Sequence, residues 1–282
     1  MHATIIGIDG GMGQWMNNHL IGLGYTVTGF DERKGDTPSI ISKADLVVVS
    51  VPIAVTSEII MKALKHMKPG ACLMEIASLK SGVHETLVEA SRLGFNVLCV
   101  HPMFGPSATN PENKTVAVIP VKDADSEIRL TRKIFPGTSI EKIEAEQHDR
   151  LMSIILSLPY LVNMAIAGCL VEEDLGLLRR LSGTSFLLQY VLAQSIVQEK
   201  TELVETLIGG NKFLEATSNR FIENMVQLQE KTGTNEFQRL HSAIRDSLSR
   251  DPDSGVFSVM RMEAFESIRG LLSNCTEQNH SR

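Results

Sequence analysis

The sequence lacks most of the features that mark secreted, nucleic-acid-binding and membrane-spanning proteins. Only four of its 282 residues are cysteines, and they are widely separated, which predicts reduced thiols and neither disulfides nor a metal site. A formal net charge of −6 argues against a general affinity for nucleic acid or for membrane surfaces. The chain shows no charged-then-apolar leader and no apolar run of membrane-spanning length, so we expect a cytoplasmic protein.

The apolar pattern changes near residue 145 and predicts two domains, at 1–145 and 146–282. The contents of hydrophobic residues (43%) and of charged residues (21%) are typical of a globular chain. Up to residue 145, short apolar runs alternate with helical patterns, which favours an α/β domain with a parallel-type sheet covered on both faces. We expect helices at 12–23, 55–65 and 83–93, and strands at 3–8, 26–30, 46–51, 72–76, 96–100, 115–120 and 139–143.

Residues 146–282 show only the apolar periodicity of helices, so the second domain is expected to be all-α. The helical segments are 146–170, 171–182, 185–208, 211–231, 234–249 and 255–272, followed by a polar tail that we expect to fray. Breaks are expected at Gly209-Gly210, Thr232-Gly233-Thr234 and Asp251-Pro252-Asp253. The helices at 151–170 and 186–197 have more apolar surface than a small domain can bury. We therefore expect a homodimer through this domain, with a well-filled monomeric core as the alternative.

A glycine-rich turn follows the first strand and suggests a nucleotide site. It reads Gly7-Ile8-Asp9-Gly10-Gly11-Met12-Gly13, between a strand and a helix. Glycines here let the backbone turn tightly and approach a pyrophosphate at the positive end of the helix. Gly10 and Gly13 fill the second and third places of the Gly-x-Gly-x-x-Gly pattern of Rossmann-like domains. Ile8 departs from it at the first place, where Gly7 and Gly11 could restore the freedom.

Asp31 closes the second strand about 20 residues further on, where a carboxylate accepts hydrogen bonds from the adenosine ribose. A carboxylate repels a 2′-phosphate, so NAD is favoured over NADP. Arg33 and Lys34 are close enough to keep NADP open as the alternative.

Further polar residues follow the other strands of the first domain. Ser50-Val51-Pro52 ends the third strand, Ser78-Leu79-Lys80 the fourth, and His101 the fifth. Ligands bind at the carboxyl ends of strands in such sheets, so these signals converge on one edge. They argue for a dehydrogenase over a methyltransferase, which uses a similar glycine turn and acidic residue.

Together these residues resemble the prephenate dehydrogenase family, and the chain looks like an archaeal-like member with a divergent helical half. Family members carry a glycine turn ending in Met-Gly, a Ser-x-Lys after a strand, and a His-Pro-Met-Phe-Gly-Pro segment. The matching residues are Met12-Gly13, Ser78-Leu79-Lys80, and His101-Pro102-Met103-Phe104-Gly105-Pro106, with Ser107 following. In the helical half, His148-Asp149, Leu158-Pro159 and Asn211 also match.

The resemblance implies a Rossmann-like domain followed by a helical dimerisation domain, and oxidative decarboxylation of a cyclohexadiene carboxylate with NAD, in tyrosine biosynthesis or a related aromatic pathway. His101 would accept the C4-hydroxyl proton or a hydrogen bond from that hydroxyl. Ser78 would hold the histidine or the same hydroxyl, and Lys80 would supply positive charge near a substrate carboxylate or the cofactor. The structural alternatives are a capped loop histidine, a helix N-cap serine and a solvated surface lysine.

The helical half departs from the family pattern at the substrate site. Ser195 stands where the family usually has an arginine that grips the side-chain carboxylate, and Tyr160 replaces a histidine, though it can still donate a hydrogen bond. Arg179, Arg180, Arg220 or Arg245 could replace that arginine, or the alignment is off by a helical turn. The third possibility is a relative of prephenate, such as arogenate or 4-amino-4-deoxyprephenate.

Two other functions compete with this assignment. Dehydrogenases of the 3-hydroxyacid type share the two-domain plan, but their lysine motif is absent early in the helical half. Gly210-Asn211-Lys212 is a partial match too far along the chain. A non-catalytic dinucleotide sensor would explain the missing arginine, but such a protein needs none of Ser78, Lys80 and His101.

Overall fold

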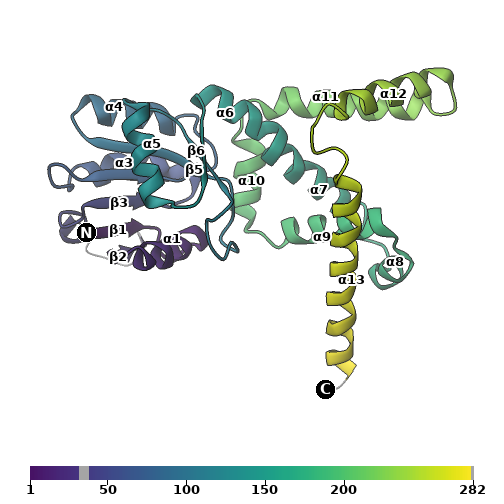
Figure 1. Ribbon diagram of the computed structural model, residues 1–282, viewed down its shortest axis with the longest axis horizontal. Coiled ribbons are helices and arrows are strands. Elements are labelled where there is room, and N and C mark those ends of the chain that lie inside the picture. Colours follow the sequence, from purple (N-terminus) through teal and green to yellow (C-terminus); the bar gives the residue numbers. More distant parts are fainter. Residues whose placement is uncertain (32–37, 281–282) are drawn as a thin grey trace. The chain divides into compact units, whose positions relative to one another are not determined.

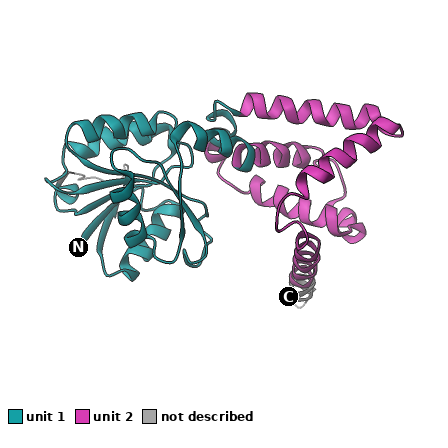
Figure 2. Cartoon of the chain, turned by 45° about the horizontal axis from the view of Figure 1, so that its top comes forward, with its two compact units in different colours: residues 1–155, 205–213 teal, residues 156–204, 214–282 magenta. Residues whose placement is uncertain are grey.

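The computed structural model describes residues 1–31 and 38–280 of the chain (Figure 1). The chain divides into two compact units. The first contains Met1–Ile155 and Glu205–Phe213, and the second contains Leu156–Val204 and Leu214–Arg282 (Figure 2). The first unit is an α/β structure, and the second is helical, as the change of apolar pattern indicated.

A seven-stranded sheet with the order β2-β1-β3-β4-β5-β6-β7 forms the centre of the first unit. All seven predicted strands are present. The strands β1 to β5 pair in parallel, and β6 pairs in parallel with β7. The pair of β5 and β6 is antiparallel, so the prediction of a parallel sheet is wrong at this pair. Residues 103–114 between β5 and β6 contain no helix, and a parallel pair needs a longer crossover. The strands are β1 His2–Ile6, β2 Thr26–Phe30, β3 Leu46–Val49, β4 Cys72–Glu75, β5 Asn96–Pro102, β6 Thr115–Val118 and β7 Ser139–Lys142.

Helices cover both faces of this sheet, as predicted. Ile60 and Leu87, from α3 and α4, pack into a buried apolar cluster with Leu73. Met16 of α1 packs with Leu98 in a second cluster. The helices are α1 Gly11–Gly22, α2 Pro38–Ile41, α3 Ile53–Leu64, α4 Val83–Arg92, α5 Ala124–Ile134 and α6 Ala145–Met152.

The sequence did not predict α2 or α5. The missed signal for α5 is Asp123, whose side chain accepts hydrogen bonds from the backbone N–H groups of Asp125 and Ser126 and caps the helix.

Helices also make up the second unit, but two predicted segments are interrupted. Segment 146–170 consists of α6, one π-helical turn and α7, and segment 185–208 breaks after α9 at residues 198–200. The breaks near residues 209–210, 232–234 and 251–253 are confirmed, and α13 continues through the segment expected to fray. The remaining elements along the chain are η1 Ser153–Ser157, α7 Leu158–Gly168, α8 Leu175–Leu181, α9 Thr184–Val197, α10 Thr201–Gly209, α11 Leu214–Lys231, α12 Asn235–Leu248 and α13 Phe257–His280. Residues 153–155 of η1 and 205–209 of α10 belong to the first unit.

One continuous helical run among the described residues, Ala145–Gly168, is long and apolar enough to cross a membrane by length and composition. The expectation that the chain has no such run is therefore wrong. The core helix of a globular domain passes the same test, and a single run of this kind is weak support for a membrane span. Of the most apolar 18 residues of this run, only 22% are buried within the chain.

The packing of the second apolar cluster can be tested at Leu98 of β5. Leu98 is fully buried, so Leu98→Ala should lower the free energy of unfolding by about 2–5 kcal/mol, measured by urea denaturation. Leu93 is 64% exposed, and Leu93→Ala should change the free energy of unfolding by no more than about 0.5 kcal/mol. Equal losses for the two variants would contradict the assigned core.

Candidate active site

The glycine turn after β1 is shaped by two close backbone approaches. Gly7 has a φ of +86°, and a Cβ there would lie 2.2 Å from the carbonyl oxygen of Ser50. A Cβ at Gly13 would lie 2.0 Å from the carbonyl oxygen of Gly7. Only glycine fits at either position, so the start of α1 lies directly against the ends of β1 and β3. The predicted residues Gly7, Gly13 and Ser50 are thus brought together.

The amino terminus of α1 is suited to an anion. Its N-cap is Gly10, which has no side chain to accept from the first N–H groups, and its first turn holds no acidic residue. Gly11 is exposed there, and Met12 is half-buried against the apolar cluster beneath. Free N–H groups and the helix dipole favour a phosphate at this position, so the residues present fit the pyrophosphate of a dinucleotide.

Three other predicted cofactor residues follow neighbouring strands. Asp31 is half-buried directly after β2, which pairs with β1. Val51 follows β3, and its side chain lies within 3.1 Å of the position a Cβ at Gly7 would take. Pro52 caps α3. Arg33 and Lys34, on which the NADP alternative rested, lie outside the described residues.

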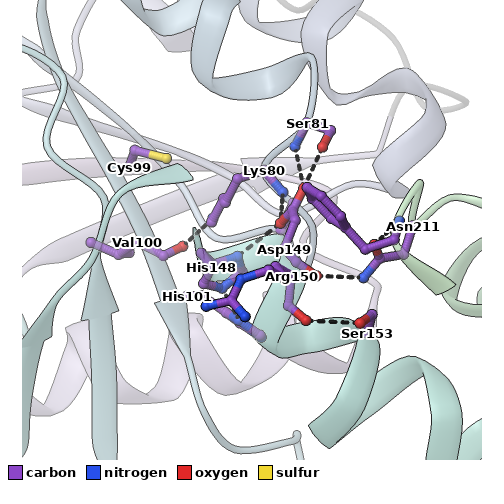
Figure 3. Close-up of polar contacts among 12 residues, drawn as sticks. Lys80, Ser81, Cys99, Val100, His101, His148, Asp149, Arg150, Ser153 and Asn211 are labelled. Atoms are coloured by element: carbon purple, nitrogen blue, oxygen red, sulfur yellow. Dashed lines mark hydrogen bonds and ion pairs between the residues drawn. The ribbon is translucent and has the colours of Figure 1, made fainter. Parts of the chain in front are cut away.

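His101 lies near the end of β5 and contacts a second histidine. Its side chain is buried, with 6% of its surface exposed. Its Nδ1 lies 3.0 Å from Nε2 of His148, a residue of α6, and the rings meet edge to face (Figure 3). His148 Nδ1 lies 2.8 Å from Oδ1 of Asp149. The three side chains therefore form a continuous line from a carboxylate to the predicted base.

Asp149 holds this line in place through several further hydrogen bonds. Its carboxylate accepts from the backbone N–H of Lys80 at 2.9 Å and of Ser81 at 2.7 Å, and from the Ser81 hydroxyl. Its backbone carbonyl accepts from the side-chain amide of Asn211 at 2.8 Å (Figure 3). Burial would raise the pKa of Asp149, but the hydrogen bonds from His148, Ser81 and Lys80 outweigh it and lower the pKa to about 2. Asp149 is thus ionised at neutral pH.

The surroundings of His101 keep it neutral. Burial lowers the pKa of His101 well below its ordinary 6.5, the positive charge of Lys80 and the neighbouring His148 lower it further, and Asp149 opposes them. A neutral imidazole has one nitrogen lone pair available to accept a proton. His101 therefore has the protonation state that a general base needs at neutral pH.

Lys80 is not the solvated lysine of the alternative interpretation, nor does it face an open site. Its side chain is fully buried, and its ammonium donates to Glu75 Oε1 at 2.6 Å and to the carbonyl oxygen of Val100 at 2.7 Å. The thiol of Cys99 donates to the same Glu75 oxygen at 2.9 Å. The expectation that Lys80 supplies charge near a bound carboxylate is therefore corrected: its ammonium contacts groups beneath the site, next to the backbone of His101.

Ser78 lies half-buried between β4 and α4. It is not the N-cap of that helix, because Gly82 is, and Gly82 lies four residues further on. The N-cap alternative for Ser78 is therefore excluded. Its contact with His101 or a substrate hydroxyl stays a prediction.

The segment after His101 packs on α1. Trp15 of α1 donates its indole N–H to the carbonyl oxygen of Ala108 at 2.7 Å, and its ring meets that of Phe104. A Cβ at Gly11 would lie 3.0 Å from Pro106. A cavity of about 570 Å³ runs between α1 and residues 106–111. The loop that follows His101 thus rests against the turn suited to a dinucleotide.

Two protein-family models match the chain over most of its length. The model described as prephenate dehydrogenase, nucleotide-binding domain, matches residues 1–136, and the model described as prephenate dehydrogenase, dimerization domain, matches residues 144–246. The chain belongs to the prephenate dehydrogenase family. The resemblance inferred from the sequence motifs is confirmed, and so is the fold class.

Curated relatives agree with membership of the prephenate dehydrogenase family. The chain is 25% identical over 263 residues to a probable arogenate/prephenate dehydrogenase of Methanocaldococcus jannaschii, covering 86% of this chain and 56% of the relative. It is 27% identical over 168 residues to a 4-amino-4-deoxyprephenate dehydrogenase of Streptomyces pristinaespiralis, covering 53% and 56%. The chain thus spans little more than half the length of these relatives.

The fold is shared with a prephenate dehydrogenase from A. aeolicus solved in complex with hydroxyphenyl propionate and NAD⁺. The TM-score is 0.68 at 19% identity, over 89% of this chain and 98% of the other.

The substrate residues expected from the prephenate dehydrogenase pattern lie in the second unit. Tyr160 is half-buried on α7, and burial, with the negative charge of Glu199, raises the pKa of its phenol. Ser195 is exposed on α9, where its hydroxyl donates to the Leu192 carbonyl oxygen at 2.9 Å. Arg179 and Arg180 are exposed in the last turn of α8. Their roles toward a substrate stay predictions.

Sequence reasoning missed two members of the site. His148 was noted as a family match, but its contact with His101 was not foreseen. Glu75 was not noted at all. A signal for it was present, because a carboxylate inside an otherwise apolar predicted strand needs a buried partner.

The buried ion pair allows a stability test. Lys80→Met leaves the Glu75 carboxylate without its ammonium partner, so we expect the free energy of unfolding to fall by about 3–5 kcal/mol in urea denaturation. The double variant Lys80→Met/Glu75→Gln should recover part of this loss. Lys62 forms an exposed pair with Glu58 at 2.8 Å, and Lys62→Met should cost less than about 1 kcal/mol. A small loss for Lys80→Met would show that its charge is not buried.

Proposed function

We propose that this protein catalyses the NAD-dependent oxidative decarboxylation of prephenate, or of a close cyclohexadiene relative, in tyrosine biosynthesis or a related aromatic pathway. The observation that carries the proposal is the buried, neutral His101 at the carboxyl end of β5, in the same unit as a turn suited to a dinucleotide. Membership of the prephenate dehydrogenase family and the names of the curated relatives support it.

The chemistry assigned to His101 is removal of one proton. The C4 hydroxyl of the ring gives its proton to the imidazole, which allows the carbon to become a carbonyl and then, after loss of carbon dioxide, part of an aromatic ring. The dinucleotide, when bound, supplies the acceptor for the hydride. Ser78 is assigned to hold the histidine or the hydroxyl, and Lys80 acts through the backbone beside His101.

Prephenate is the first choice of substrate, with arogenate and 4-amino-4-deoxyprephenate as relatives of the same chemistry. These compounds differ in the side chain or in the C4 substituent of the ring. All three carry a side-chain carboxylate, and Ser195 lacks the cation that would pair with it, so we expect another group to bind that carboxylate here. Tyr160 is proposed as a hydrogen-bond donor, since its raised pKa keeps the phenol protonated at neutral pH. Arg179 and Arg180 are the proposed replacements for the missing arginine.

NAD is the proposed cofactor, with NADP less favoured. Asp31 stands after β2, where its carboxylate suits the ribose hydroxyls and opposes a 2′-phosphate. Gly7, Gly10, Gly11, Met12 and Gly13 would line the pyrophosphate, with Ser50, Val51 and Pro52 beside them.

We also propose that the second unit joins two copies of the chain. Large apolar side chains of α9 are exposed, including Leu192 and Val197, and the matching family model is described as a dimerization domain. Light scattering should give twice the mass of one chain, and a single-chain mass would contradict the dimer. The described cysteines are all free thiols, which agrees with a cytoplasmic enzyme.

The substrate is tested by following reduced nicotinamide at its absorbance band. Prephenate, arogenate and 4-amino-4-deoxyprephenate are each mixed with the protein and NAD, and then with NADP. We expect turnover with at least one of the three, and faster with NAD. Intact NAD binding without turnover of any of them would overturn the proposed function.

His101→Asn tests the base. The variant should bind NAD as the wild type does, because His101 lies outside the glycine turn, while kcat falls by about 10²–10⁴-fold. His66 is an exposed histidine of the same unit, and His66→Asn serves as the matched control with unchanged kcat. A His101→Asn enzyme with full rate would remove His101 from the mechanism.

A further inference from the structure

The line of side chains behind His101 determines which of its nitrogens is available. His101 Nδ1 and His148 Nε2 lie 3.0 Å apart, and one hydrogen must lie between them for a hydrogen bond to form. We propose that His148 and Asp149 are positioning residues that hold His101 in the tautomer with the proton on Nδ1, leaving Nε2 free to accept the substrate proton. This inference rests on the proposed function in one respect only, namely that the proton accepted by Nε2 comes from the substrate.

The direction of the line is set at Asp149. Its carboxylate accepts from two backbone N–H groups, those of Lys80 and Ser81, and from the Ser81 hydroxyl. Ionised carboxylates only accept hydrogen bonds, and this one is buried among donors. The contact at 2.8 Å therefore requires a proton on His148 Nδ1, which donates to Asp149 Oδ1.

The second step follows from the contact between the two rings. Only one hydrogen lies between His101 Nδ1 and His148 Nε2, so one of these two nitrogens carries it and the other is bare. A neutral His148 that is protonated on Nδ1 has a bare Nε2, which can only accept. His101 must then donate from Nδ1, and its Nε2 is the nitrogen left without a proton.

The charged and titratable groups around His101 come from three elements. Lys80 follows β4, Glu75 and Cys99 lie on β4 and β5, and His148 with Asp149 lie on α6. Glu75 contacts the Lys80 ammonium at 2.6 Å and so balances it. The Asp149 carboxylate is the remaining negative charge on the line through His148. It stabilises His101 when that ring becomes a cation on accepting a proton.

The tautomers can be observed directly, without substrate, by nitrogen-15 NMR of the histidine rings at about pH 8, above the ordinary histidine pKa. We expect both His101 and His148 to be protonated on Nδ1 and bare on Nε2. His84 and His19 are internal references of the opposite kind, because their Nε2 atoms lie 2.8 Å and 2.6 Å from backbone carbonyl oxygens and must donate. A His101 ring protonated on Nε2 would overturn the proposal.

Substitution of His148 separates positioning from simple packing. His148→Gln keeps an acceptor for His101 Nδ1, so we expect the Nδ1–H tautomer to persist and kcat to stay within about threefold of wild type. His148→Leu removes the acceptor. We expect a share of His101 to shift its proton to Nε2, and kcat to fall by about 10–10²-fold, the usual effect of losing a partner that orients a ring. The affinity for NAD should be unchanged in both.

His84→Leu is the matched control, since it replaces a half-buried histidine of the same unit whose ring bonds the carbonyl of Pro120. Its kcat should equal that of the wild type. Equal losses of kcat for His148→Gln and His148→Leu would show that His148 acts by packing alone and overturn the proposal. If His148→Leu does not fold, the ring spectra of the wild type and of His148→Gln still decide the question. A wild-type protein with the expected tautomers but no turnover of any cyclohexadiene would contradict the proposed function and leave the positioning role intact.

Discussion

The site depends on the carboxylate of Asp149. It accepts the backbone N–H groups of Lys80 and Ser81 in the turn after β4, and it also accepts from His148 on its own helix. One buried group thus joins the end of the central sheet to α6 and fixes the histidine that faces His101. Several donors to one ionised carboxylate outweigh its desolvation, which is why its pKa lies at about 2 despite burial. Without this group, the backbone N–H groups of Lys80 and Ser81 and the ring of His148 would lose this acceptor.

A second buried charge, that of Lys80, lies close to His101. The Lys80 ammonium is removed from water and compensated by Glu75 and by the Val100 carbonyl. Such pairs contribute little net stability, because desolvation consumes most of their Coulomb attraction. Here the pair has an evident second effect, since a cation beneath His101 disfavours protonation of the imidazole. The buried pair therefore favours a neutral His101, and groups with shifted pKa values of this kind are common at active sites.

Much of the first unit could be predicted from the sequence, because its signals are local. The strands follow from apolar runs, and the turn around Gly7 and Gly13 from glycines at positions that no Cβ can occupy. The strand β6 was predicted, but its antiparallel direction was missed, because the direction of a strand depends on the connection that leads to it. The Ser78-Leu79-Lys80 motif was found in the sequence, but the burial of the Lys80 side chain was not predicted. Lys80 reads as a charged residue at a strand end, and only the fold shows that Glu75 lies beneath it.

The second unit could be predicted less well. Its helices follow from periodicity, but the π-helical turn at Ser153–Ser157 and the break after α9 come from packing, which the sequence pattern does not record. The same is true of His148. A His-Asp pair in a helix has no assigned partner until β5 and α6 are brought together, so its contact with His101 is a property of the tertiary fold. Ser195 illustrates the converse, since its departure from the family pattern is visible only in the sequence.

The central claim is that His101 acts as a neutral, buried base, and the pH dependence of kcat/KM tests it most directly. A base must be unprotonated, so the rate falls as the pH drops through the pKa of the free enzyme. Because burial, Lys80 and His148 lower the pKa of His101, the account predicts a level profile through pH 6.5 and a fall only well below it. A profile that already halves at or above pH 6.5 would contradict the account, because it would mean that the base is solvated or is another group.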